Sequence, residues 1–230
     1  MSKSELIKKG IVQLLNTKAV IKQDVYASTR KYFENLKEVL VKVVDEYNLQ
    51  IENQDKRIQL RFQDKGEYVA QLKVAGDVLV FHMHTNTFEF DREHEVWKSE
   101  YVKGNVANSY CGVINIYNFL HDSFRYNRMN DIGYLIARVF VNREGHYFVE
   151  GKRQHGTGIK DFGTSILSPD KWQQIVETAV LYALEFDLLV PPYDDVKLIS
   201  MLQMNDEMMN SQMRTGKRLG FVYNADDVSQ

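Results

Sequence analysis

Two histidines and a glutamate form the clearest chemical pattern in the sequence. One residue separates His82 from His84, and Glu89 follows five residues later. On a β-strand, residues i and i+2 project from the same face, so both imidazoles can converge on one ion. If the chain turns at Thr85-Asn86, Glu89 completes a facial site of two histidines and a carboxylate. One hypothesis is therefore a divalent metal site at His82, His84 and Glu89.

The same run continues upstream to a glycine and reads G-x5-H-x-H-x4-E from Gly76 to Glu89. It resembles the first half of the first metal-binding motif of the cupin superfamily. The resemblance implies a metal-dependent enzyme. Val96 stands where that motif has its next glycine, and His155 is the nearest candidate for the histidine of the second motif. The alternative is a strand with both histidines on its exposed face and the intervening apolar residues turned to the core.

A second pattern is a glycine-rich basic loop, GKRQHGTGIK at 151–160. Glycines let backbone amides approach an anion closely, and the basic side chains supply charge. The segment FRYNR at 124–128 interleaves basic and aromatic residues, which suits single-stranded nucleic acid or a nucleotide. The candidate anion-binding residues are the basic side chains of these segments: Arg125, Arg128, Lys152, Arg153, His155 and Lys160. The alternative is a solvated loop, with the two aromatic residues capping the core edge.

A third pattern combines Glu67, Gln71 and Lys73, which share one face of an expected strand. It resembles the metal-holding motif of restriction-type nucleases, in which an acidic residue precedes E-x-K or Q-x-K. Asp55 or Asp64 would supply the remaining acid. An ordinary amphipathic strand produces the same pattern.

The common catalytic and nucleotide-binding signatures are missing from the sequence. It contains no G-x-G-x-x-G after a strand, no G-x-x-x-x-G-K-[ST], no H-E-x-x-H, no paired C-x-x-C and no G-x-S-x-G. This favours a binding or regulatory protein without a catalytic motif. The alternatives are a metal-dependent enzyme and a nucleotide- or nucleic-acid-binding or processing protein that uses the basic loop.

The elements that position these residues follow from periodicity. Apolar residues spaced three and four apart predict a short helix at 4–16 and a longer one at 22–48. Alternating patterns and apolar runs then predict strands at 56–63, 67–74, 78–84, 110–120, 132–141 and 146–152, with 87–90 extending the third or adding another. Turn residues centred near Lys65-Gly66, Gly76 and Glu144-Gly145 predict antiparallel hairpins.

The C-terminal part is predicted to be helical again. Ser168 suits an N-cap and Pro169 the first helical position of a helix that runs to about Leu188. A last helix at 195–213 carries five of the eight methionines. Because thioether side chains re-pack easily, this helix suits a protein partner or a second copy as well as core packing.

Strands segregated from helices predict an α+β fold, a mostly antiparallel meander of about six to seven strands flanked by N-terminal and C-terminal helices. We expect one domain over 1–220, helical at 1–50 and 168–213 with the sheet at 56–152, and a disordered tail at 221–230.

Composition bounds the partners and the compartment. The net charge is −2 over 230 residues. The sequence therefore lacks the basic stripe that is expected of a dedicated duplex-DNA binder. No run of 18 apolar residues and no apolar leader is present, so we expect no membrane association. A single cysteine, Cys111, cannot form an internal disulfide. These features predict a soluble, cytoplasmic protein.

Overall fold

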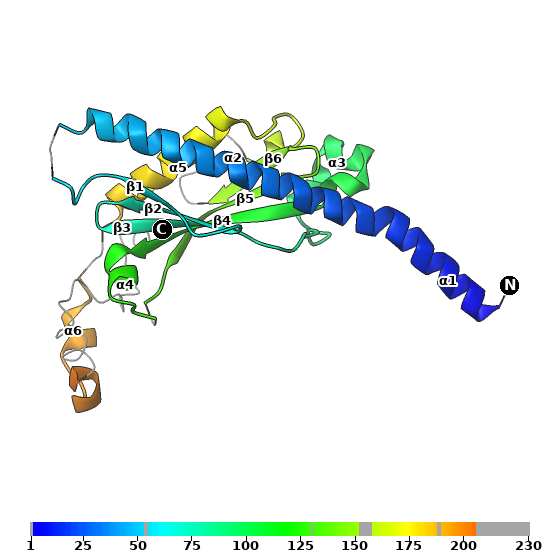
Figure 1. The fold of residues 1–230 in the computed structure, drawn as a ribbon. Coiled ribbons are helices and arrows are strands. Elements are labelled where there is room, and N and C mark those ends of the chain that lie inside the picture. Colours follow the sequence, from blue (N-terminus) through cyan, green and yellow to red (C-terminus); the bar gives the residue numbers. More distant parts are fainter. Residues whose placement is uncertain (1, 53–54, 130, 152–157, 188–189, 206–230) are drawn as a thin grey trace.

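A six-stranded antiparallel sheet forms the centre of the computed structural model, which describes residues 2–52, 55–129, 131–151, 158–187 and 190–205 (Figure 1). The strands are β1 (Arg61–Asp64), β2 (Val69–Val74), β3 (Asp77–Met83), β4 (Cys111–Leu120), β5 (Tyr134–Asn142) and β6 (Tyr147–Gly151). Each strand pairs with its neighbours in sequence, in the order β1-β2-β3-β4-β5-β6. The predicted α+β meander is therefore confirmed.

The three predicted hairpins are confirmed, and positive backbone angles explain their turn residues. Gly66 has φ +107° in the β1–β2 turn, and Gly145 has φ +82° in the β5–β6 turn. Ala75, with φ +49°, precedes Gly76 between β2 and β3. Glycine adopts such angles without steric cost, whereas alanine does so less readily.

Two predicted strand boundaries are wrong. The first strand begins at Arg61 rather than at residue 56, because both backbone groups of Leu60 bond to the side chain of Asn48 at 2.9 Å. Residues 87–90 form no strand, and Phe88 makes only an isolated bridge to Cys111. Both edges of β3 are already paired, one to β2 and one to β4. Residues 87–90 therefore cannot pair with β3 as a further strand.

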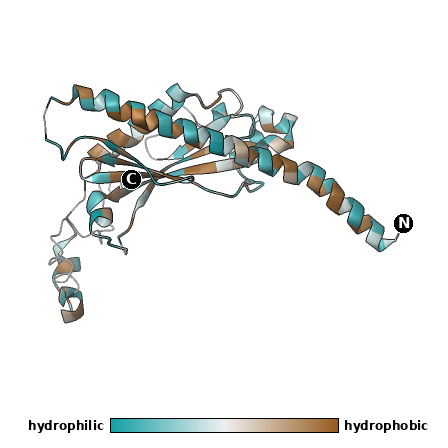
Figure 2. Cartoon of the chain, in the orientation of Figure 1, coloured by the Kyte–Doolittle hydropathy of each residue, from teal (hydrophilic) through white to brown (hydrophobic). Residues whose placement is uncertain are grey.

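Two long helices, α2 (Val20–Gln50) and α5 (Pro169–Glu185), cover one face of the sheet (Figure 1). Buried apolar residues of α2 recur with the predicted three-four spacing, and hydropathy colouring shows the same alternation along the helix (Figure 2). Gly112 of β4 lies directly under Thr29, where an added Cβ would overlap that side chain. The absence of a side chain at residue 112 therefore lets α2 approach the sheet closely.

The N-terminal helices are nearly continuous, which corrects the expected separation near residue 20. Helix α1 (Lys3–Leu14) joins α2 through a π-helical turn, η1 (Leu15–Ala19). Residues 11–50 contain neither glycine nor proline, so nothing in the sequence ends the helix. The side chain of Ser2 accepts a hydrogen bond from the Glu5 backbone, and a capping box starts the helix.

The second face of the sheet has two parts. Over β4–β6, a smaller apolar cluster packs beneath the short helices η2 (Glu95–Lys98), α3 (Glu100–Gly104), η3 (Val106–Ser109) and η4 (Ile159–Asp161). Phe140 and Phe148 from the sheet meet Val96, Val102 and Phe162 there. Toward β1–β3, the same face carries polar and charged side chains beside α4 (His121–Arg125). This open part of the sheet holds the site described below.

The C-terminal part is partly as predicted. Ser168 caps α5, accepting a hydrogen bond from the Lys171 backbone. The expected single helix over 195–213 is wrong in its described part, because α6 (Tyr193–Val196) ends before a second helical segment begins at residue 201. The backbone of Ser200 donates a 3.0 Å hydrogen bond to the Gln203 side chain, and the backbone of Gln203 donates one of 3.1 Å to the Ser200 side chain. These two bonds cap the N-terminus of the second helical segment. Residues 206–213 and the predicted tail lie outside the described residues.

Within the described residues, no helix combines the length and apolar character that crossing a membrane requires.

Candidate functional site

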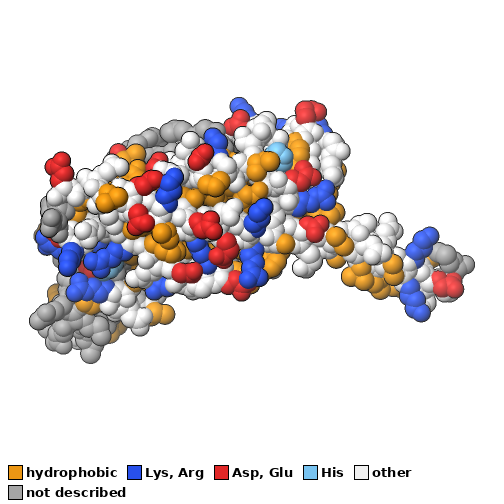
Figure 3. Space-filling view, turned by 45° about the horizontal axis from the view of Figure 1, so that its top comes forward, with side chains coloured by type: hydrophobic (Ala, Val, Ile, Leu, Met, Phe, Trp, Pro, Cys, Tyr) orange, Lys and Arg blue, Asp and Glu red, His pale blue; other side chains and the backbone are white. Residues whose placement is uncertain are grey.

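A hollow of about 330 Å³ opens on the uncovered face of β1–β3, beside α4. We call it the basic hollow, and its lining residues are Arg61, Gln63, Lys65, Gln71, Lys73, Val78, His121, Phe124 and Arg125. Four of them are cationic, two are amides and none is a carboxylate. In Figure 3, Lys and Arg side chains gather at the left end of the molecule, where β1, β2 and α4 lie in Figure 1.

The antiparallel register builds most of this lining. Arg61 lies opposite Lys73 and Gln63 opposite Gln71 across the β1–β2 pair, and Lys73 lies opposite Val78 on β3. Directly opposed residues project from the same face of a sheet. A hairpin with polar residues at alternate positions therefore brings two cations and two amides together.

Helix α4 supplies the third side of the hollow. The backbone of His121, at the end of β4, donates a 2.8 Å hydrogen bond to the Gly76 carbonyl in the β2–β3 turn. Arg125 follows four residues later, and positions i and i+4 lie on the same side of a helix. The β2–β3 turn thus fixes where α4 begins, and α4 directs His121 and Arg125 toward β1 and β2.

The positive groups of the basic hollow interact unfavourably with one another. The pKa of Lys73 is lowered mainly by burial and next by the charge of Arg61, against an opposing effect of Asp55. The pKa of His121 is also lowered, mainly by burial and next by Lys73, while Asp122 opposes the shift. Like charges and desolvation both disfavour the protonated forms. An anion in the hollow would oppose the part of these shifts that comes from like charges.

A row of aromatic rings borders the hollow. The ring centroids of Tyr117 and Phe119 lie 6.5 Å apart, and those of Phe119 and Phe124 lie 5.5 Å apart. The side chain of Phe119 lies against Gly133, where an added Cβ would overlap the ring. Phe124 is 45% exposed. An exposed π-face therefore lies beside the cationic groups.

The predicted anion-binding residues are not all at this site. Arg125 lines the basic hollow. Arg128 is largely buried and lies 4.0 Å from Asp131, so it has a structural partner. Lys160 lines a separate hollow with Tyr101 and Phe162. The other three, Lys152, Arg153 and His155, lie outside the described residues.

Two of the three predicted metal ligands have other partners, and the ring centroid of the third, His82, lies 6.4 Å from that of His84. His84 Nδ1 accepts a 3.0 Å hydrogen bond from the Asn86 backbone. Glu89 accepts a hydrogen bond from the Tyr110 hydroxyl at 3.2 Å, and its carboxylate pairs with Lys18 and Arg92. In the described parts of the chain, no three His, Cys, Asp or Glu side chains are grouped so that they could hold a metal ion.

The nuclease-like pattern is divided by the structure. Gln71 and Lys73 line the basic hollow, whereas Glu67 pairs with Arg30 of α2 at 2.9 Å. The sequence analysis missed Arg61, Lys65 and His121. The hairpin predicted at Lys65-Gly66 indicates that Arg61 lies beside Lys73, because its register sets residue 61 opposite residue 73.

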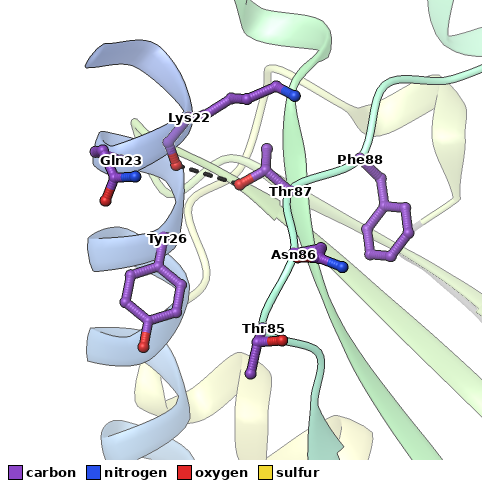
Figure 4. A pocket seen from close by; sticks show the side chains of 7 residues that line it. All are labelled: Lys22, Gln23, Tyr26, Thr85, Asn86, Thr87 and Phe88. Carbon is purple, nitrogen blue, oxygen red and sulfur yellow. Dashed lines mark hydrogen bonds between the residues drawn. The ribbon is translucent and has the colours of Figure 1, made fainter. Parts of the chain in front are cut away.

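A larger hollow of about 640 Å³ lies between α2 and residues 85–88 (Figure 4). A 3.2 Å hydrogen bond from the Thr87 hydroxyl to the Lys22 carbonyl holds its two sides together. Lys22 is the one charged residue among those that line it, and the Tyr26 hydroxyl is engaged with Tyr68 at 2.7 Å. Fewer charged side chains line this hollow than line the basic hollow.

Comparison with known proteins gives no relative: no family model, no curated protein and no solved structure matches the chain.

Proposed function

We propose that this chain is a non-catalytic binding protein whose basic hollow holds the phosphate groups of a nucleotide or a single-stranded nucleic acid. One observation carries the proposal: Arg61, Lys73 and Arg125 converge on one hollow in whose lining no carboxylate takes part. Positive charge without lining carboxylates favours an anionic ligand.

The lining offers complementary contacts for a phosphate. Arginine guanidinium groups can donate two parallel hydrogen bonds to phosphate oxygens, whereas a lysine acts as a point charge. Two arginines and two lysines line the hollow, and the amides of Gln63 and Gln71 add neutral donors and acceptors. This set suits a sugar-phosphate backbone better than an isolated inorganic ion, because a chain of phosphates and sugars uses both kinds of group.

The aromatic row accounts for the nucleic-acid part of the proposal. Stacking of a base on an aromatic side chain contributes roughly 1–3 kcal/mol and tolerates any base. Phe124 lines the hollow and is 45% exposed, so its ring is accessible to a base whose phosphate contacts Arg125. The expected ligand is therefore single-stranded, because a base inside a duplex has both faces stacked on its neighbours.

Cytoplasmic placement belongs to the same proposal. Cys111 is a free, buried thiol. Thiols persist in reducing compartments, where nucleotides and RNA are abundant.

Fluorescence anisotropy with labelled single-stranded oligonucleotides and with labelled nucleotides tests the proposal. We expect the double variant Arg61→Gln/Lys73→Gln to bind oligonucleotide roughly tenfold more weakly or worse, since charge-assisted hydrogen bonds are lost. Losing two phosphate contacts should also reduce the slope of log affinity against log salt by about 1.4.

The matched control is Arg30→Gln/Lys31→Gln, which removes two charges from α2, away from the basic hollow. It should bind like the unmodified protein. An equal loss in both double variants would indicate nonspecific attraction and defeat the proposal. So would an unmodified protein that binds neither probe at low salt.

A further inference from the structure

Helix α1 presents an apolar stripe that nothing in its own chain covers within the described residues. No residue of α1 is buried. Five apolar side chains on one side of α1 and η1 are each more than half exposed: Leu6, Ile7, Ile11, Leu14 and Leu15. Figure 3 shows hydrophobic side chains along the projecting helix, with basic ones near its tip. Monomeric proteins rarely expose a contiguous apolar surface of this kind without a use for it.

This stripe has the same three-four spacing as the core-facing side of α2. On α2, Tyr32, Phe33 and Leu36 are buried against the sheet and α5. On α1, the three-four spacing continues through Ile7, Ile11 and Leu14, but the sheet does not extend beneath it (Figure 1). The helix thus carries a packing surface beyond the end of its own core.

Among the described residues, a second apolar surface without cover lies near the other end of the chain. We call residues 190–205 the C-terminal segment. Large apolar side chains of this segment are each more than half exposed: Val190, Tyr193, Val196, Leu198, Met201 and Leu202. Its two short helical stretches pack on no core cluster. This segment includes part of the methionine-rich region at 195–213.

The two surfaces lie at opposite ends of the molecule (Figure 1). Helix α2 separates them, and its 31 residues span about 46 Å at 1.5 Å per residue. Phe186, which follows α5, packs on Tyr134 at the start of β5, whereas Lys18 pairs with Glu89 near the start of β4. The four residues 186–189 that connect α5 to the C-terminal segment reach at most about 14 Å. As folded, α1 and the C-terminal segment of one chain therefore do not meet.

Their charges are complementary. Residues 2–18 contain Lys3, Lys8, Lys9 and Lys18 against Glu5, a net charge of +3. The C-terminal segment contains Asp194 and Asp195 against Lys197, a net charge of −1. Two α1 helices would repel each other, whereas α1 and the C-terminal segment attract.

From these observations we propose that a second copy of this chain covers both surfaces. Two copies lie side by side in opposite directions, and α1 of each packs on the C-terminal segment of the other. One two-fold arrangement then buries both apolar surfaces and pairs opposite charges at both contacts. This dimer is independent of the proposed phosphate binding, since the basic hollow uses other residues.

Light scattering coupled to gel filtration tests the dimer. The unmodified protein should have twice the 26.9 kDa mass of the chain. Ile7→Glu/Ile11→Glu and Leu198→Glu/Met201→Glu should each weaken association on the order of 100-fold, because a charge would be buried without a partner. Each variant should then elute as a monomer with an unchanged circular dichroism spectrum of its folded body.

Mixing the two variants is the decisive step. The α1 variant retains an intact C-terminal segment and the C-terminal variant retains an intact α1, so a mixed pair keeps one unmodified contact. We expect the mixture to form dimers that neither variant forms alone. Pairing between two α1 helices would instead leave the C-terminal variant dimeric, and that result would overturn the proposal.

A control on the same helix is Val12→Glu. Val12 is 56% exposed but lies on the side of α1 away from the stripe, so this variant should remain dimeric. An unmodified protein that is monomeric at high concentration would exclude the proposal. A monomer whose α1 binds vesicles containing phosphatidylserine would assign the helix to a membrane surface instead.

Discussion

Lys73 and Arg61 lie directly opposite each other on adjacent antiparallel strands, and both side chains line the same hollow. Like charges at directly opposed positions destabilise a sheet. The charge of Arg61 contributes to lowering the pKa of Lys73, after burial. The charge of Arg61 therefore disfavours the protonated form of Lys73, and a bound anion would oppose this effect.

The first prediction is that Arg61→Gln stabilises the protein without ligand. Removing one of two opposed like charges should raise the free energy of unfolding by about 0.2–0.5 kcal/mol. The midpoint of urea unfolding measures this. Arg57→Gln serves as the control, because Arg57 is paired with Asp55 at 2.6 Å and is not among the residues that line the hollow. A lower midpoint for Arg61→Gln would contradict the argument.

The second prediction concerns the pH dependence of binding. The pKa of His121 is lowered in the free protein, first by burial and next by Lys73. A bound phosphate favours the protonated imidazole and raises this pKa, so binding takes up a proton. Affinity for an oligonucleotide without terminal phosphates should therefore rise as the pH falls from about 7.5 to about 5.5.

The His121→Gln variant separates this effect from general electrostatics. Phosphodiester groups keep a constant charge over that range, so the probe itself does not titrate. Anisotropy titrations with the variant should show a markedly flatter pH profile at similar affinity near neutral pH. An unchanged pH profile would show that His121 does not face the ligand.

The third prediction concerns the β5–β6 turn. Gly145 has φ +82°, and an added Cβ there would overlap the hydroxyl of Tyr32 on α2. Gly145→Ala should lower the free energy of unfolding by about 1–3 kcal/mol through backbone strain and overlap together. Gly66→Ala is the matched control, because Gly66 also has positive φ but faces open space. Gly66→Ala should lower the free energy of unfolding only by the contribution of backbone strain.

A double variant tests the overlap itself. Adding Tyr32→Phe to Gly145→Ala removes the hydroxyl that the new methyl group meets. The pair should be more stable than the sum of the single changes predicts, and chemical denaturation measures this coupling. Strict additivity would mean that the methyl group is accommodated elsewhere.

The fourth prediction compares two helix caps. The Ser168 side chain accepts a hydrogen bond from the Lys171 backbone at the start of α5, which is buried in the core. Ser168→Ala should lower the free energy of unfolding by about 1 kcal/mol. Ser2→Ala removes the equivalent bond from α1, which buries no residue within its own chain, so it should leave global unfolding unchanged at concentrations where the chain is monomeric. Equal losses at both caps would show that α1 is part of the cooperative unit.

The sequence supported the prediction of those elements whose pattern is local. Alternation and turn residues predicted the hairpins at Gly66 and Gly145, and three-four spacing predicted the core side of α2. The start of β1 was missed because Asn48, 12 residues away, takes both backbone groups of Leu60. No short window of sequence contains that contact.

Residues of the candidate site belonged to separate sequence patterns. Arg125 belonged to one pattern and Lys73 to another, and neither pattern pointed to the other. Their convergence depends on where β4 ends, since the bond from His121 to the Gly76 carbonyl places α4 over the β1–β2 hairpin. Convergence of this kind is a property of strand length and register, which composition does not encode.

The position of α2 has a consequence for how the chain is made. This helix leaves the ribosome before the six strands of the sheet, yet it packs on β4, β5 and α5. At about 5–20 residues per second, the 118 residues between the end of α2 and the start of α5 take roughly 6–24 s to synthesise. For that interval the side of α2 that will enter the core lacks part of its final packing, the contacts with α5. The nascent chain thus offers a long amphipathic helix to whatever binds apolar surfaces near the ribosome, and the final closure waits for α5.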